Sequence, residues 1–233
     1  MLKHQTDAYR RLRNTLRYLL GNLHGFEPSQ AVTINEMPEL ERWVLHRLWQ
    51  LDVQIRRCCN EFDFHELFLE LYNFCTNDLS AFYFDIRKDT LYCDPANSSA
   101  YRASQTVLAH LFDCLTAWLA PILCFTAEEA WLQRNPGDDK SIHLQTFPEI
   151  SDAWCDNDIG SKWEKILEVR RVVLGALEIE RAEKRIGSSL QADPTVYMTE
   201  AHAAAFEGVD LAEITITSDA VIKTSLAPEN SFT

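Results

Sequence analysis

Apolar residues recur every three or four positions along most of this 233-residue chain. That spacing is typical of α-helices that bury one face, and it predicts a mainly α-helical protein built as an antiparallel helical bundle. The 7 glycines and 8 prolines are few, which favours long helices over many short strands. Pro121 should break one helix, and Thr126 with Glu129 resembles the capping box of the next. The predicted helices cover residues 2–23, 38–60, 65–86, 98–123, 126–133 and 161–185.

The first predicted helix, residues 2–23, has an apolar face and a basic face. On a helical wheel of about 100° per residue, the leucines gather on one side and four polar residues gather on the other. A guanidinium is a rigid fork of donors suited to phosphate, so this face is a candidate for contact with RNA. The alternative is an ordinary solvated surface, because any amphipathic helix carries polar residues opposite its apolar stripe. The four polar residues are Arg10, Arg13, Asn14 and Arg17.

The second predicted helix, residues 38–60, repeats this arrangement. An aromatic ring among basic groups can stack on an unpaired base while Arg or protonated His meets phosphate. The alternative is that Trp49 packs against a neighbouring helix, since large aromatic side chains mostly enter cores. The polar face of this helix carries Arg42, His46, Trp49, Arg56 and Arg57.

The third predicted helix, residues 65–86, is apolar around more than half of its circumference and should be buried among other helices. Polar groups on a buried helix need partners. Asn73 and Asp78 are therefore expected to anchor the first helix, through Asn14 or Arg17. Residues 87–97 are a predicted loop.

The long loop over residues 135–158 is the predicted domain boundary, and its SIHLQ stretch is expected to form a brief extended segment. The helical bundle then occupies residues 1–150, and residues 151–233 form a long helix followed by a small α/β junction subdomain. The end of the chain, from residue 224, has no clear signal, which suggests a fragment. Beyond Gly187, strands are predicted at 195–198 and 212–217 and a helix at 200–206.

The net charge of −13 argues against nucleic acid until its distribution is considered. Residues 1–60 hold nine Lys and Arg against six Asp and Glu, so the N-terminal part is locally basic within an acidic chain. A phosphate backbone responds to the local field rather than to the total charge. A second, weaker basic cluster in residues 162–185 adds Lys184 and Arg185 as candidates.

The seven cysteines are expected to be reduced, because their number is odd, two are adjacent and none forms a C-x-x-C pair. The N-terminus has no apolar segment like that of a signal peptide, and no apolar run of about 18 residues would span a membrane. These observations predict a cytoplasmic protein.

Signatures of catalysis are absent from the sequence. It has no phosphate-binding glycine loop, no G-x-S-x-G or H-E-x-x-H motif, and no spacing of His and Cys typical of a metal site. We therefore expect no catalytic residues, no metal and no cofactor in this chain.

Six stretches resemble the isoleucyl-tRNA synthetase family of class I aminoacyl-tRNA synthetases, and they occur in the family's order. RNTLRYLLGN and LSAFYFDIRKDTLY are more like the isoleucine enzymes than their valine, leucine or methionine relatives. The resemblance covers nearly the whole chain and implies the region that follows the catalytic domain. The stretches lie at residues 7–23, 38–48, 62–94, 121–131, 141–149 and 163–192.

The resemblance implies a C-terminal anticodon-binding region without its catalytic domain. The signatures HxGH and KMSKS, which handle ATP in the family, do not occur here. The parent enzyme would be a ligase that joins isoleucine to its tRNA with ATP and Mg²⁺, with zinc held by C-terminal cysteine pairs that this chain lacks. The partners of this chain would be tRNA(Ile) and the catalytic and C-terminal regions of the same polypeptide. No membrane would be involved.

The sequence thus predicts recognition of the anticodon stem-loop of tRNA(Ile). The alternative is a helical protein–protein interaction module with no role in RNA binding, whose basic stripe docks on an acidic protein surface. The candidate RNA-binding residues are Arg10, Arg13, Asn14, Arg17, Arg42, His46, Trp49, Arg56, Arg57, Lys184 and Arg185.

Overall fold

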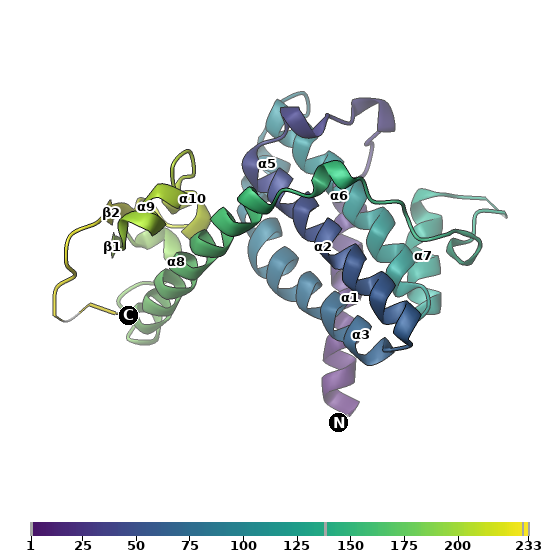
Figure 1. The fold of residues 1–233 in the computed structure, drawn as a ribbon, viewed down its shortest axis with the longest axis horizontal. Coiled ribbons are helices and arrows are strands. Elements are labelled where there is room, and N and C mark those ends of the chain that lie inside the picture. The colour runs from purple at the N-terminus through teal and green to yellow at the C-terminus, as the bar shows by residue number, and fades with distance from the viewer. Residues whose placement is uncertain (1, 138, 230, 233) are drawn as a thin grey trace. The chain divides into compact units, whose positions relative to one another are not determined.

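Helices dominate the computed structural model, which describes residues 2–137, 139–229 and 231–232 (Figure 1). The prediction of a mainly α-helical chain is confirmed. The chain divides into two units, with the division between Asp156 and Asn157. Among the described residues, no helix combines the length and the apolar character needed to cross a membrane.

The first unit is a bundle of α-helices joined by shorter helical turns. Its α-helices are α1 (Leu2–Asn22), α2 (Glu39–Glu61), α3 (Phe64–Asn73), α4 (Phe84–Ile86), α5 (Lys88–Cys93), α6 (Ser99–Leu119) and α7 (Cys124–Arg134). The turns are the 3₁₀ helices η1 (Pro28–Gln30), η2 (Ile34–Glu36), η4 (Ile142–Leu144) and η5 (Asp152–Trp154), and the π-helix η3 (Phe74–Tyr83).

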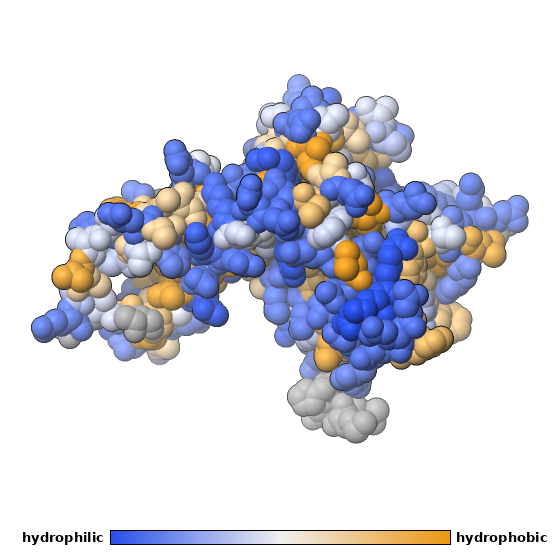
Figure 2. Space-filling model, viewed as in Figure 1, coloured by the Kyte–Doolittle hydropathy of each residue, from blue (hydrophilic) through white to orange (hydrophobic). Residues whose placement is uncertain are grey.

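The core of the bundle forms around α6, which packs against α1, α2, α5 and α7. The leucines of α1 at helical spacing, Leu12, Leu16 and Leu19, are at most 2% exposed. Ser98 caps α6 by accepting a hydrogen bond from the backbone N–H of Tyr101, as its position before the apolar run predicts. Apolar patches on the face drawn in Figure 2 are scattered among hydrophilic residues.

The predicted third helix is not a continuous α-helix, because its middle is the π-helix η3. The N–H of Phe84 donates to the carbonyl of Leu79, five residues earlier. Within η3 the hydroxyl of Ser80 donates to the carbonyl of Cys75 at 2.8 Å, again five residues back. Serine hydroxyls that bond to earlier carbonyls disturb regular helical geometry, and π-helices are rare.

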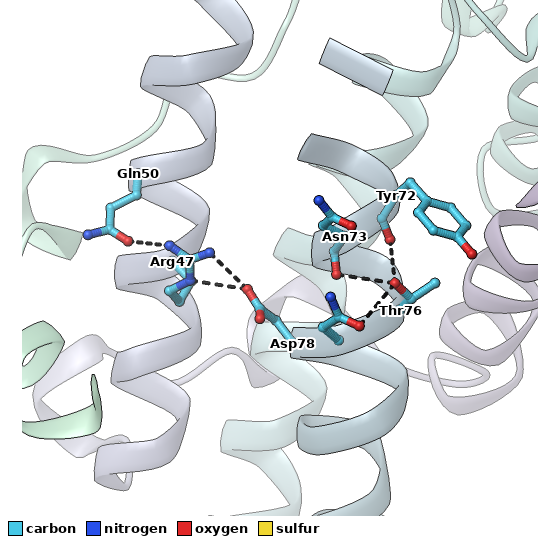
Figure 3. A network of polar contacts seen from close by, with 7 residues as sticks. Arg47, Gln50, Tyr72, Asn73, Thr76 and Asp78 are labelled. Carbon is cyan, nitrogen blue, oxygen red and sulfur yellow. Dashed lines mark hydrogen bonds and ion pairs between the residues drawn. The ribbon is translucent and has the colours of Figure 1, made fainter. Parts of the chain in front are cut away.

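Asp78, on η3, pairs with Arg47 of α2 (Figure 3), and no described residue of α1 shares this pair. The Oδ2 atom of Asp78 accepts from Arg47 Nε at 3.1 Å and from a terminal nitrogen at 2.9 Å. Burial raises the pKa of Asp78, and the neighbouring Arg47 opposes that rise. The expected anchor to Asn14 or Arg17 is therefore wrong for Asp78.

Three local predictions in the bundle are also wrong. Within the predicted loop 87–97, residues Lys88–Cys93 form α5. The SIHLQ segment is not extended, because it contains the 3₁₀ turn η4. Thr126 does not cap α7, which begins at Cys124; its hydroxyl instead lies 3.1 Å from the hydroxyl of Tyr9 on α1.

The second unit begins with the long helix α8 (Asn157–Ala182), which buries Trp163 and Ile166 at 1% and 0% exposure. It continues with η6 (Ser189–Gln191), β1 (Thr195–Tyr197), α9 (Glu200–Ala205), α10 (Leu211–Thr215) and β2 (Val221–Lys223). The two strands pair in parallel, with Thr195 opposite Val221.

The predicted strand over residues 212–217 is wrong, because residues 212–215 belong to α10 and the helix ends there, with Ile216 in a left-handed backbone conformation. Asp210 caps the helix by accepting from the N–H of Ala212. Leu211 and Ile214 are both buried and lie three residues apart, so they occupy one helical face. The second strand forms instead at Val221–Lys223.

Candidate nucleic-acid interface

The polar face of α1 is on the surface of the bundle, as the helical wheel predicts. Arg10, Arg13, Asn14 and Arg17 are all exposed, while the leucines between them are buried. The helix is therefore oriented by its apolar stripe, and its guanidinium groups are left on the outer side.

Two of these three arginines already have carboxylate partners. Arg13 forms a bidentate pair with Glu129 of α7, with N–O distances of 2.7 and 3.0 Å. The hydrogen bonds of this pair raise the pKa of Arg13 and lower the pKa of Glu129. Arg10 pairs with Asp7 at 3.0 Å within α1. Both pairs are solvent-exposed, so a phosphate group can compete with the carboxylate for either guanidinium.

Arg17 makes no ion pair with any residue that the structure describes. It lies beside an open groove of about 410 Å³ between α1 and α5. The groove is lined by Asn14, Arg17, Tyr18, Gly21, Asn22 and Tyr92. Of the three predicted arginines of α1, Arg17 is thus the one that can bind a phosphate without breaking an ion pair.

Tyr92, from α5, is a residue of this groove that the sequence analysis did not select. Its side chain is 66% exposed, which is unusual for a large aromatic residue. The sequence predicts a loop over residues 87–97, and the KDTLYC segment inside it is too short to show a helical period. The helix α5 is what brings Tyr92 next to α1.

A buried ion pair fixes the start of α5. Arg87, the residue directly before α5, binds the carboxylate of Glu41 on α2 through Nε at 2.6 Å and a terminal nitrogen at 2.8 Å. The hydroxyls of Tyr83 and Ser104 donate to the same carboxylate at 3.2 and 3.1 Å. All four side chains are buried. The network therefore joins α2, η3 and α6 at the point where α5 begins.

His46 does not lie on the exposed face of α2, and that expectation is wrong. The residue is 1% exposed, and its Nδ1 atom accepts from the backbone N–H of Asp156 at 3.1 Å. Trp49, whose ring lies 6.2 Å from that of His46, is only half-buried. It borders a second groove of about 470 Å³ together with Arg47 and Gln50. Trp49 therefore keeps an accessible face.

Three arginines of α2 differ in how many hydrogen bonds they make within the bundle. Arg56 binds Asp52 at 2.8 Å and the carbonyl of Pro148 at 2.8 Å. Arg57 binds Glu61 at 3.0 Å and Glu66 at 2.7 Å. Arg42 is half-buried, and its Nε atom has no hydrogen-bond partner among the described residues. Arg56 and Arg57 thus tie α2 to later parts of the bundle, and their contact with RNA stays a prediction.

Lys184 and Arg185 belong to the second unit and follow the end of α8. Lys184 has a left-handed backbone with φ of 58°, which turns the chain after the helix. Arg185 pairs with Glu180, with one N–O distance of 2.6 Å, and also with Glu183. These hydrogen bonds raise the pKa of Arg185, and the three side chains of the cluster are 40% to 54% exposed.

Comparison with known proteins places this surface in context. Residues 41–196 match the family described as the anticodon-binding domain of tRNA ligase. An isoleucine–tRNA ligase from Mesorhizobium japonicum is 52% identical over 100% of this chain. Those from Agrobacterium fabrum and Rhodopseudomonas palustris are 52% and 47% identical over 97% and 96% of it. The chain spans only 22% to 23% of the length of these three relatives.

Proposed function

Because the chain belongs to the family of anticodon-binding domains of tRNA ligases, we propose that it binds the anticodon stem-loop of tRNA(Ile). In this proposal it is the anticodon-binding part of an isoleucine–tRNA ligase. The observation that carries the proposal is the outer face of α1, where Arg17 has no ion-pair partner among the described residues and lies beside an open groove, and where the carboxylate that pairs with Arg13 is solvent-exposed. Guanidinium groups that neutralise phosphates release counterions, and this release makes binding favourable and salt-dependent.

The remaining functions of the ligase belong to parts of the polypeptide outside this chain. Those parts would use ATP and Mg²⁺ to attach isoleucine to the tRNA, and their cysteine pairs would hold zinc. They are also the chain's partners within the same polypeptide. The seven cysteines here are all free thiols, which fits a reducing cytoplasm as the place of action.

Binding of a fluorescent anticodon stem-loop of tRNA(Ile), measured by anisotropy over a range of salt concentrations, tests the proposal. Arg17→Ala should weaken binding and lower the salt slope by about one, the value expected for one lost phosphate contact. Arg171→Ala is a matched control, because Arg171 is an exposed arginine on α8 of the second unit. Unchanged affinity and slope in Arg17→Ala would refute the role of the α1 face.

The alternative, a protein–protein module without an RNA role, predicts a different result. In that case neither tRNA(Ile) nor its stem-loop should bind at low salt, and excess RNA should not displace a bound protein partner. The similarity to isoleucine–tRNA ligases over almost the whole chain does not favour this alternative.

A further inference from the structure

The groove between α1 and α5 has a rigid floor. The ring of Tyr18 on α1 stacks on Phe84 with centroids 4.2 Å apart and an interplanar angle of 20°. Its hydroxyl donates to the carbonyl of Phe84 at 3.4 Å. The amide nitrogen of Asn22 donates to the carbonyl of Tyr18 at 2.9 Å. The contacts of Tyr18 fix the end of α1 to the start of α4, and the bond of Asn22 lies within α1, so the groove exists before any ligand binds.

One wall of the groove is an exposed aromatic ring on a fixed helix. Tyr92 is 66% exposed, whereas Leu91 beside it is 8% exposed and holds α5 on the bundle. The start of α5 is fixed by the buried pair of Arg87 and Glu41. A ring that is exposed and yet carried by an anchored helix loses little freedom when a flat ligand stacks on it.

The other wall carries polar groups suited to a nucleotide. Arg17 supplies a guanidinium that has no ion pair within the described part of the chain, and Asn14, three residues earlier and so on the same face, supplies an amide with donors and an acceptor. A guanidinium binds phosphate in a bidentate way, and an amide can bond to a base edge or a ribose hydroxyl. Among the described residues that line this groove, Arg17 is the cation, and Lys88 at the start of α5 is paired with Asp85.

From this arrangement we propose that the groove holds one unpaired nucleotide of the bound tRNA. The base stacks on Tyr92, its phosphate binds Arg17, and Asn14 contacts the base edge or the ribose. This inference rests on the proposed function, and it adds a specific subsite to it. Base–aromatic stacking is the usual way in which proteins hold bases that are not paired.

The test measures the affinity of the whole 233-residue chain for tRNA(Ile) and for its anticodon stem-loop. Tyr92→Ala should weaken binding by about 5- to 150-fold, which corresponds to the ~1–3 kcal/mol of one stacked base. Tyr92→Phe keeps the ring and should bind like the wild type. Phe125→Ala is the matched control, because Phe125 is 91% exposed and lies outside the groove.

A second variant fills the groove without removing a contact. A Cβ atom at Gly21 would meet nothing within 4 Å, and leucine is a better helix former than glycine. Gly21→Leu should therefore fold normally, as checked by circular dichroism and thermal unfolding, and still weaken tRNA binding. Gly21→Ala, which adds too little volume to occupy the groove, should not weaken it.

The outcomes separate the two proposals. Loss of affinity for both RNAs places the nucleotide in the anticodon stem-loop, and loss for the full tRNA alone places it elsewhere in the tRNA. Wild-type affinity in both Tyr92→Ala and Gly21→Leu, alongside salt-dependent binding by the wild type, overturns the subsite but not the proposed function. If the wild type binds neither RNA at low salt, the proposed function fails and the subsite fails with it.

Discussion

The guanidinium of Arg87 and the carboxylate of Glu41 form a buried, two-pronged ion pair, with N–O distances of 2.6 and 2.8 Å. Removing one member of such a pair leaves an uncompensated charge in the core. Arg87→Ala should therefore lower the free energy of unfolding by ~3–5 kcal/mol, measured by urea denaturation followed by circular dichroism.

The double variant Glu41→Leu, Arg87→Met is the control for this prediction. Replacing both charges by apolar side chains of similar size removes the desolvation cost together with the attraction, so most of the lost stability should return. A double variant as unstable as Arg87→Ala would show that the fold depends on the network's hydrogen bonds rather than on charge balance.

Glu129 restrains Arg13, and removing that restraint should strengthen the binding of RNA. In Glu129→Ala the guanidinium of Arg13 loses its bidentate partner, and one negative charge leaves the surface. We expect tighter binding of the anticodon stem-loop and a steeper dependence on salt, because one more cation is available for phosphate. Stability should change little, since both groups are exposed.

Titration of the stem-loop at several salt concentrations measures this effect. Glu164→Ala serves as the control, because it removes an exposed carboxylate from α8 of the second unit. If Glu129→Ala binds more weakly than the wild type, the pair orients Arg13 for RNA rather than competing with it.

His110 should make the bundle less stable in mild acid. Its ring lies 4.8 Å from that of Trp154, and burial lowers its pKa below the ordinary value of 6.5. As the pH falls below 6.5, the unfolded chain takes up a proton that the folded chain still excludes, so the free energy of unfolding decreases. His110→Gln should lose this part of the pH dependence, measured as the difference in midpoint of urea unfolding between pH 7 and pH 5.

The comparison with His110→Gln isolates this histidine from nearby carboxyl groups. Burial raises the pKa of Asp113, and the resulting effect on stability has the opposite sign. A variant whose stability falls with acid as steeply as that of the wild type would contradict the assignment to His110.

Gly21→Ala should stabilise the bundle. Glycine costs a helix roughly 0.5–1 kcal/mol relative to alanine, and a Cβ atom at Gly21 meets no other group within 4 Å. The gain should appear as a higher urea midpoint with an unchanged slope. A lower midpoint would mean that the backbone at Gly21 needs the freedom of glycine.

The periodic parts of the fold could be predicted because local pattern and burial agree there. Leu12, Leu16 and Leu19 orient α1, and Ser98 marks the start of α6. The short helix α5 could not be predicted in this way, because its six residues are too few to show a period and its start is fixed by Glu41, 46 positions from Arg87. The alternation in residues 212–217 was misleading, since the apolar residues of α10 also satisfy helical spacing.

In the candidate site, too, the sequence predicts the local pattern but not the contacts between distant segments. A helical wheel identifies which side of α1 is polar, and the structure places those residues on the surface. A helical wheel cannot identify partners that are distant in sequence. Glu129 lies 116 positions from Arg13, and Tyr92 reaches the groove only through tertiary packing. His46 was misplaced because the segment that covers it, near Asp156, is remote in sequence.

The π-helix η3 sets the angular register of Arg87 and α5, which follow it in the bundle. Its backbone bonds reach back five residues, whereas α-helical bonds reach back four. Deleting one residue between Phe74 and Tyr83 would let the segment close into α-helical turns, and Arg87 would then rotate away from Glu41 while Tyr92 turned off the groove. The number of residues in η3 therefore determines both whether Arg87 meets Glu41 in the core and whether the ring of Tyr92 lies beside the groove.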